Sequence, residues 1–224
     1  MPKRKIPLVN GEIYHIFNRS IAKIPILDKK RAFDRFLEIV DYYRFTHPPV
    51  RFSYFLRMPQ TKRSALINSL AANNDVDMEI LAFGIMTNHF HFLLRQTKDN
   101  GISKFVGLIQ NSFAKYFNLI TQRTGSVFQQ AFKSVRIESE RQFIHTARYI
   151  HLNPITDFVI NKPQELVYSN QTSLLDYTSD KPRPFLNTKL LLSHFPSKER
   201  LKQYTLDQVD YQRTLAQIKH LINE

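Results

Sequence analysis

The sequence predicts an α+β fold, in which a largely antiparallel sheet carries helices against it. Short segments rich in β-branched and aromatic residues are typical of strands, and two long segments with apolar residues at a period near 3.6 are typical of helices. The 224 residues are enough for one sizeable hydrophobic core. Strands interleaved with long helices favour the α+β class.

The first elements are a strand at residues 12–19 and a helix that follows Asp28. The strand is β-branched and aromatic, and Asp28 is suited to be the N-cap of the helix. Apolar residues continue at helical spacing as far as Tyr43. The helix is expected to stop before the prolines at 48–49, because a residue that precedes proline disfavours helical geometry.

The next segment is expected to hold two strands and a loop. Residues 50–56 predict the second strand, and the polar stretch 59–77 predicts a loop with a short helix. A third strand is expected at 78–86, and Thr87-Asn88 can make a turn into the strand that follows.

A long amphipathic helix is expected at 102–120, followed by a strand at 128–137. Ser139 and Gln142 match a capping box, so a second long helix should begin there. It should end near Asn153, because a proline follows.

The chain after about residue 160 is rich in proline and serine and then helical again, from Asn187 and from Ser197. We therefore expect two units: a main domain at 1–160 and a mainly helical C-terminal extension at 161–224.

The charge predicts a polyanionic partner. Lysine and arginine exceed aspartate and glutamate to give a net charge of +13, and residues 1–159 carry +11 of it. No apolar run approaches the roughly 20 residues that span a bilayer, and the start of the chain does not resemble a secretion signal. Cysteine is absent, which excludes disulfides and thiolate metal sites. We expect a soluble, cytoplasmic protein that binds nucleic acid.

The most informative motif is a pair of histidines in an apolar strand at 86–94. Side chains alternate along a strand, so His89 and His91 share one face, while Phe90 and Phe92 point into the core. Two imidazoles on one face can bind a metal ion. The alternative is that they are polar residues on the solvated face of a sheet.

A polar stripe on the second long helix can complete this site. His145, Tyr149 and Asn153 are spaced four residues apart and lie on one helical face. If that face meets His89 and His91, the Asn153 amide oxygen becomes a third metal ligand. Such a neutral, half-open site leaves positions for phosphate oxygens.

The chemistry that suits this site is phosphodiester transfer by Tyr149. A tyrosine hydroxyl can attack a phosphate and form a covalent intermediate, but its usual pKa of about 10 leaves it almost entirely protonated at neutral pH. A metal ion would help by polarising the phosphate. His145 or water can take the phenolic proton. Tyr149 can alternatively be a packed helix residue, and Tyr116 is a competing nucleophile.

Basic residues of the main domain are candidates for contacts with DNA phosphates, although they can also serve only solubility. They are Arg19, Lys133, Arg136, Arg141 and Arg148.

Several short motifs occur in a fixed order along the chain. Each is weak evidence for a family by itself, but the combination is specific. They are residues 14–19, the Met-Thr-Asn-His-Phe-His run at 86–91, Tyr116-Phe117-Asn118, residues 128–134, and Arg148-Tyr149-Ile150-His151-Leu152-Asn153-Pro154. Over residues 8–160 the chain resembles the single-tyrosine HUH-type transposases, most closely those associated with repetitive extragenic palindromes in bacteria. It departs from the usual family pattern at Thr87, where proline is common, and at Ser20, where glycine is common.

The resemblance implies a role for each residue of the site. His89 and His91 would be the HUH histidines, Tyr149 the nucleophile and Asn153 the third metal ligand. It also implies a ferredoxin-like antiparallel sheet, Mg²⁺ or Mn²⁺ as cofactor, and cleavage of single-stranded DNA near a hairpin. The products would be a 5′-phosphotyrosine link and a free 3′-hydroxyl.

Two other functions stay open: a catalytically silent protein that binds structured DNA on the same fold, and a protein in which the metal is structural. The chain can act as a monomer or a homodimer. No Gly-rich phosphate loop, His-Glu-x-x-His or Gly-x-Ser-x-Gly motif is present, which argues against nucleotide hydrolysis, metalloprotease and serine hydrolase functions.

Overall fold

The structure is a computed structural model that describes residues 7–73 and 75–209. Within these residues four strands form one sheet: β1 (Ile13–Arg19), β2 (Met78–Ile85), β3 (His89–Gln96) and β4 (Lys133–Arg136). Their order is β2-β3-β1-β4, and every neighbouring pair is antiparallel. Helices connect β1 to β2 and β3 to β4, which is the ferredoxin-like arrangement. The predicted α+β fold with this sheet is confirmed.

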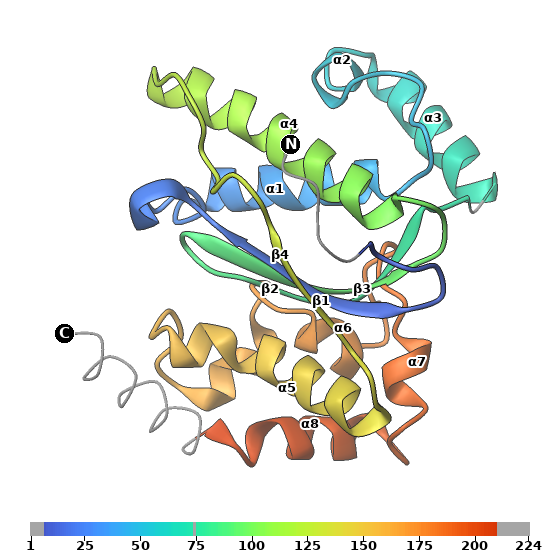
Figure 1. Cartoon of the computed structure of the whole chain (residues 1–224), viewed down its shortest axis with the longest axis vertical. Helices are drawn as coiled ribbons and strands as arrows, with labels where there is room; N and C mark the ends of the chain where they lie inside the picture. Colours follow the sequence, from blue (N-terminus) through green and yellow to red (C-terminus); the bar gives the residue numbers. More distant parts are fainter. Residues whose placement is uncertain (1–6, 74, 210–224) are drawn as a thin grey trace.

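The α-helices follow in chain order. They are α1 (Lys30–Tyr43), α2 (Phe52–Phe55), α3 (Gln60–Asn73), α4 (Gly101–Thr121), α5 (Glu140–Thr156), α6 (Leu174–Thr178), α7 (Lys189–Leu192) and α8 (Lys198–Leu206), with 3-10 turns η1 (Ile21–Lys23) and η2 (Pro163–Tyr168). Figure 1 shows α1 and α4 against one face of the sheet and α5 to α8 against the other. Both faces of the central strands are therefore covered.

The first face confirms the predicted alternation along β3. The Phe90 ring lies 5.5 Å from Phe36 of α1, and the Phe92 ring lies 6.0 Å from Phe105 of α4, measured between ring centroids. Phe90 and Phe92 are fully buried. His89 and His91 alternate with these two phenylalanines along β3, so they must point to the other face.

On that other face, α5 begins as predicted but ends later than predicted. The Ser139 hydroxyl accepts a hydrogen bond from the Gln142 backbone N–H at 3.2 Å. The predicted end near Asn153 was wrong, because the helix continues through Pro154 to Thr156. Proline in a helix leaves the carbonyl four residues earlier without its helical hydrogen bond, and that carbonyl, of Ile150, lies close to Gly84 on β2.

The segment after residue 160 packs on the same face. Ser173 Oγ accepts a hydrogen bond from the Phe83 N–H at 3.0 Å, and the Tyr177 hydroxyl donates to the Leu81 carbonyl. Leu174 and Tyr177 are fully buried in the core that the sheet shares. The C-terminal segment thus covers β2, and it is helical in its described part, as predicted.

Three further predictions on local structure were wrong. The strand expected at 50–56 is the short helix α2, where the Phe52 N–H donates to the Tyr43 hydroxyl at 3.0 Å. The loop with a short helix expected at 59–77 is mostly the 14-residue helix α3, so the helix is longer than predicted. The N-cap of α1 is Lys29 and not Asp28, whose carboxylate instead accepts from the Lys29 N–H at 2.9 Å.

His151 links α5 to the C-terminal segment and predicts how stability changes with pH. It is buried, with Nε2 2.9 Å from Ser173 Oγ, and burial lowers its pKa to about 3. Below pH 6.5 the unfolded chain gains a proton at this histidine that the folded chain excludes, so stability falls as the pH falls toward 3. From pH 7 to pH 5 we expect His151 to contribute a loss of about 2 kcal/mol. Urea unfolding at both pH values measures it, and His151→Gln should lose about 2 kcal/mol less than wild type. An unchanged difference would contradict this assignment.

Candidate active site

The face of the sheet under α5 gathers polar and aromatic side chains from three strands. In the register, His91 lies opposite Phe17 on β1 and Gly84 on β2, and His89 lies opposite Arg19. Residues directly opposite each other in an antiparallel pair point to the same face. The His91 and Phe17 rings stack at 5.3 Å between centroids, and those of His89 and His91 are 5.2 Å apart.

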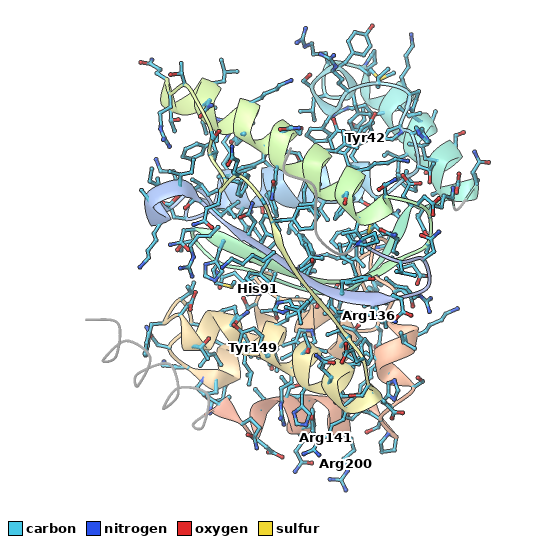
Figure 2. All side chains as sticks on the ribbon, viewed as in Figure 1. Tyr42, His91, Arg136, Arg141, Tyr149 and Arg200 are labelled. Atoms are coloured by element: carbon cyan, nitrogen blue, oxygen red, sulfur yellow. The ribbon has the colours of Figure 1, made fainter. Side chains whose placement is uncertain are left out.

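Tyr149 of α5 faces this strip. Its ring centroid lies 5.8 Å from that of His91 and 5.9 Å from that of His15, both edge-on; Figure 2 labels His91 on the sheet and Tyr149 in the helical layer beside it. Tyr149 is 37% exposed. Asn153, one turn further along α5, is buried, and its amide nitrogen forms no hydrogen bond of normal geometry, although the amide lies close enough to Tyr149 to act on the pKa of that hydroxyl. The structure thus brings together Tyr149, His89, His91 and Asn153, while the role of each stays a prediction.

His15 of β1 is a further member of the strip, which the motifs in the sequence did not single out. It is only partly buried, and its Nε2 lies 2.7 Å from His91 Nδ1. Burial lowers the pKa of His15 to about 4, so the ring is neutral at pH 7. A hydrogen bond between two neutral imidazoles occupies Nδ1 of His91 and leaves its Nε2 for another partner. Spacing alone does not reveal this contact, because it depends on the register between β1 and β3.

His89 contacts two oxygen acceptors. Its Nδ1 lies 2.6 Å from Asn88 Oδ1, and its Nε2 lies 3.2 Å from a carboxylate oxygen of Asp157. Asp157 is the C-cap of α5 and was not among the predicted site residues. It continues the four-residue spacing of Tyr149 and Asn153, but the predicted end of the helix near Asn153 left it out.

The electrostatics keep both strand histidines neutral. Burial, and then the charge of Arg19, lowers the pKa of His89 to about 4. Burial, followed by His15, His89 and Arg19, places the pKa of His91 well below its usual value. Neutral imidazole is the form that binds a metal ion.

The Tyr149 hydroxyl is protonated at neutral pH. Burial raises its pKa first, and the negative charge of Asp157 raises it further. The charge of Arg19 and the amide of Asn153 act in the opposite direction with smaller effects. A reaction at this oxygen therefore needs a group that stabilises negative charge.

The predicted DNA-binding residues occupy three places. Arg19 lies close enough to the site that its charge lowers the pKa of His91. The exposed Lys133 lies on the same face of the sheet, with Nζ 6.0 Å from the centre of the Phe17 ring. Arg136 forms an ion pair with Glu12 at 2.6 Å. Arg141 and Arg148 lie on the side of α5 that faces α8.

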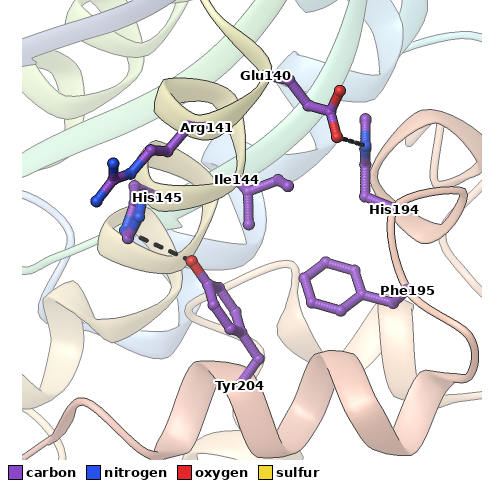
Figure 3. A pocket seen from close by; sticks show the side chains of 7 residues that line it. All are labelled: Glu140, Arg141, Ile144, His145, His194, Phe195 and Tyr204. Carbon is purple, nitrogen blue, oxygen red and sulfur yellow. Dashed lines mark hydrogen bonds and ion pairs between the residues drawn. The ribbon is translucent and has the colours of Figure 1, made fainter.

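A hollow between α5 and α8 is lined in part by Arg141 (Figure 3). It is lined by Glu140, Arg141, Ile144, His145, His194, Phe195 and Tyr204. The Arg148 guanidinium stacks 4.2 Å from the centre of the Tyr204 ring and contacts His145 Nδ1 at 2.7 Å. His145 thus bonds with side chains of the α5–α8 contact, which does not support it as the acceptor of the Tyr149 proton.

A metal ion at this site would need an amide ligand. Among residues 7–73 and 75–209, no three histidine, cysteine or acidic side chains lie close enough to hold one by themselves.

In the same described residues, no helix combines the length and apolar character needed to cross a membrane.

Comparison with known proteins agrees with the predicted family. The family model described as "Transposase IS200 like" matches residues 48–153, which include His89, His91, Tyr149 and Asn153. No curated protein matches the chain.

Two solved structures are similar. One is described as a REP-associated tyrosine transposase bound to a REP hairpin, with 12% identity over 84% of this chain and 92% of that chain and a TM-score of 0.53, which shows a shared fold. The other, from Deinococcus radiodurans, is provisionally described as a transposase. It has 17% identity over 66% of this chain and 95% of that chain, and its TM-score of 0.36 is too low to support an argument.

Proposed function

We propose that this chain, a member of the IS200-like transposase family by its match over residues 48–153, cuts and rejoins single-stranded DNA through Tyr149. The observation that carries the proposal is the Tyr149 ring 5.8 Å from His91, within one chain and on one side of the sheet. Because these groups meet within a single chain, we propose that the tyrosine acts in its own subunit.

In the proposed step, Tyr149 Oη attacks a backbone phosphorus of the DNA. The new bond joins Oη to phosphorus while the bond from phosphorus to the 3′-oxygen breaks. The phenolic proton passes to water, to which the partly exposed Tyr149 is accessible, and the departing 3′-oxygen takes up a proton. The products are a 5′-phosphotyrosine and a 3′-hydroxyl, and attack by a 3′-hydroxyl in the reverse direction rejoins the strand.

His89, His91 and Asn153 are the residues that would hold Mg²⁺ or Mn²⁺. Two features support the fit: both histidines are neutral, and the buried Asn153 amide has a nitrogen without a hydrogen bond of normal geometry. Rotation of the amide by 180° about its Cβ–Cγ bond would place its oxygen where that nitrogen stands. Such an ion, when bound, polarises the phosphate and stabilises developing charge.

The DNA strand is proposed to lie over the sheet face beside Tyr149. Arg19 and Lys133 supply positive charge there, and the partly buried Phe17 offers a ring for stacking. Arg136, Arg141 and Arg148 are proposed to guide flanking phosphates. A hairpin as substrate is supported by the structural neighbour, which is described as bound to a REP hairpin.

The test is to incubate the protein with Mn²⁺ and single-stranded DNA that flanks a hairpin, followed by denaturing electrophoresis. We expect a covalent adduct that mass spectrometry maps to the peptide containing Tyr149, and no adduct when EDTA removes the metal. The catalytically silent alternative predicts salt-sensitive DNA binding with no adduct under any condition. An adduct on another residue would exclude the proposed nucleophile.

A further inference from the structure

The hollow between α5 and α8 has the size and the aromatic wall of a ligand site. Its volume is about 540 Å³, within the range of roughly 300–1,000 Å³ that is usual for small-molecule sites. Phe195 and Tyr204 form the wall, with their ring centroids 5.3 Å apart, and Ile144 lies across from them (Figure 3). Both rings are partly exposed, so a flat ring can stack on them from the solvent side.

The polar groups around the hollow favour an anion. The Glu140 carboxylate accepts a hydrogen bond from His194 Nδ1 at 3.0 Å, so this acidic group already has a donor. His145 Nδ1 lies 2.7 Å from Arg148 Nη2, and it must be the acceptor because a guanidinium only donates. The proton of the His145 ring is therefore on Nε2, which can donate to a ligand. Figure 3 shows the Arg141 side chain beside His145.

Basic side chains at this end of the molecule are not balanced by acidic ones. Within the described ranges 7–73 and 75–209, Arg141, Arg148 and Arg200 form no ion pair with a carboxylate; the arginine ion pairs lie elsewhere. Arg200 Nη1 donates instead to the Gln203 side chain at 3.0 Å. Figure 2 shows Arg141 and Arg200 at the same end of the molecule. Uncompensated positive charge beside aromatic rings suits a phosphate that is attached to a base, as in a nucleotide.

The hollow and the proposed nucleophile share one edge of α5. Arg141, His145 and Tyr149 are exposed and spaced four residues apart, so they follow this edge in line. At 1.5 Å per residue, His145 and Tyr149 are about 6 Å apart along the helix axis. A stacked DNA strand advances about 3.4 Å per nucleotide. A strand that presents a phosphate to Tyr149 therefore reaches the hollow within a few nucleotides.

We propose that the hollow holds one nucleotide of the DNA strand, a few positions from the phosphate that Tyr149 attacks. The base stacks on Phe195 and Tyr204, and the phosphate accepts hydrogen bonds from Arg141 and His145 Nε2. This inference rests on the proposed function for the identity of the strand. The two aromatic residues lie after residue 153, where the family match ends, so the inference gives the C-terminal segment a part in binding DNA.

The first test maps the contact by photo-cross-linking. Single-stranded DNA that flanks a hairpin carries 5-iodouracil at one position at a time, and irradiation joins the modified base to an aromatic side chain beside it. We expect one position to cross-link to a peptide from residues 190–206, as identified by mass spectrometry. Thymidine monophosphate is the second probe, followed by the nuclear magnetic resonance signals of His194 and Tyr204. Shifted signals with the mononucleotide, but no cross-link from the strand, would assign the hollow to a free nucleotide and overturn the inference.

The second test is DNA affinity, measured by fluorescence anisotropy. Stacking on an aromatic side chain contributes about 5- to 150-fold in affinity per base, so Phe195→Leu should bind more weakly by that factor. Phe195→Tyr keeps the ring and should restore binding. Arg141→Ala should lower the slope of log affinity against log salt by about 0.7, the value for one phosphate contact on a single strand. The matched control is Arg57→Ala, because Arg57 is exposed and follows α2 on the opposite side of the sheet (Figure 1), and its salt slope should equal that of wild type.

The competing explanation is that the hollow is only imperfect packing between α5 and α8. It predicts wild-type affinity for Phe195→Leu and a wild-type salt slope for Arg141→Ala, and that result would overturn the inference. If Phe195→Leu unfolds at a lower urea concentration than wild type, the cross-link and the salt slope of Arg141→Ala decide. Failure of the proposed function would look different, because the strand would cross-link in the hollow without forming an adduct at Tyr149.

Discussion

Tyr149→Phe is expected to abolish the covalent protein–DNA adduct while leaving DNA binding nearly unchanged. Phenylalanine keeps the ring that lies 5.8 Å from His91 but lacks the attacking oxygen. We expect adduct formation to fall by at least about 10³-fold, because no other group can replace a nucleophile. Denaturing electrophoresis measures the adduct, and a mobility shift at low salt measures binding.

The control for this variant is Tyr116→Phe. The Tyr116 ring packs on Phe113 at 5.9 Å between centroids, and its hydroxyl is buried without a hydrogen-bond partner. This variant should form the adduct at the wild-type rate. An adduct that persists in Tyr149→Phe and disappears in Tyr116→Phe would exchange the roles of the two tyrosines.

The same experiment has an expected pH dependence. The pKa of Tyr149 lies above its usual value, because of burial and the charge of Asp157, so the phenolate is a minor species at neutral pH. If the phenolate attacks, the single-turnover rate should rise by about tenfold per pH unit between about pH 7 and pH 9. A flat profile over this window would show that the proton leaves after the rate-limiting step or that the chemistry is not rate-limiting.

Sequence patterns that depend only on residues a few positions apart in the chain predicted the fold well. The alternation of histidine and phenylalanine along β3 decides which side chains meet the α1–α4 layer, since a strand has only two faces. Ser139 and Gln142 predicted the start of α5 because an N-cap is a contact between neighbours in the chain. The helix periodicity of α1 and α4 has the same local origin.

The errors fall where contacts distant in sequence decide the conformation. The apolar run at 50–56 is compatible with a strand or a helical turn, and it is helical because Phe52 packs on Tyr42 of α1, with 5.4 Å between ring centroids, while its N–H bonds with Tyr43. His15 entered the site for a similar reason, because its contact with His91 follows from the register between β1 and β3. Asp157 was missed for a different reason: it continues the four-residue spacing of Tyr149 and Asn153, but the helix was expected to end near Asn153.

The contact between α5 and β2 gives the second large expected effect, for Gly84→Ala. A methyl group at Gly84 would lie 2.6 Å from the Ile150 carbonyl oxygen and 3.4 Å from its Cγ2 atom. The closer of these is a backbone atom of a buried helix, which cannot move away as a flexible side chain could. We expect the variant to lose about 1–3 kcal/mol of unfolding free energy, the usual cost of overpacking. Urea unfolding measures the loss.

Gly84→Ala should also slow adduct formation, since the helix it displaces carries Tyr149 and Asn153 opposite the strand histidines. A misplacement of about 1 Å can cost a catalytic site about 10²-fold in rate. The matched control is Gly107→Ala on α4, where a methyl group would meet nothing within 4 Å. That variant should be more stable by about 0.5–1 kcal/mol, because alanine is the better helix former, and should cut DNA at the wild-type rate. If Gly84→Ala matched the control in both measurements, α5 could not lie as close to β2 as the site requires.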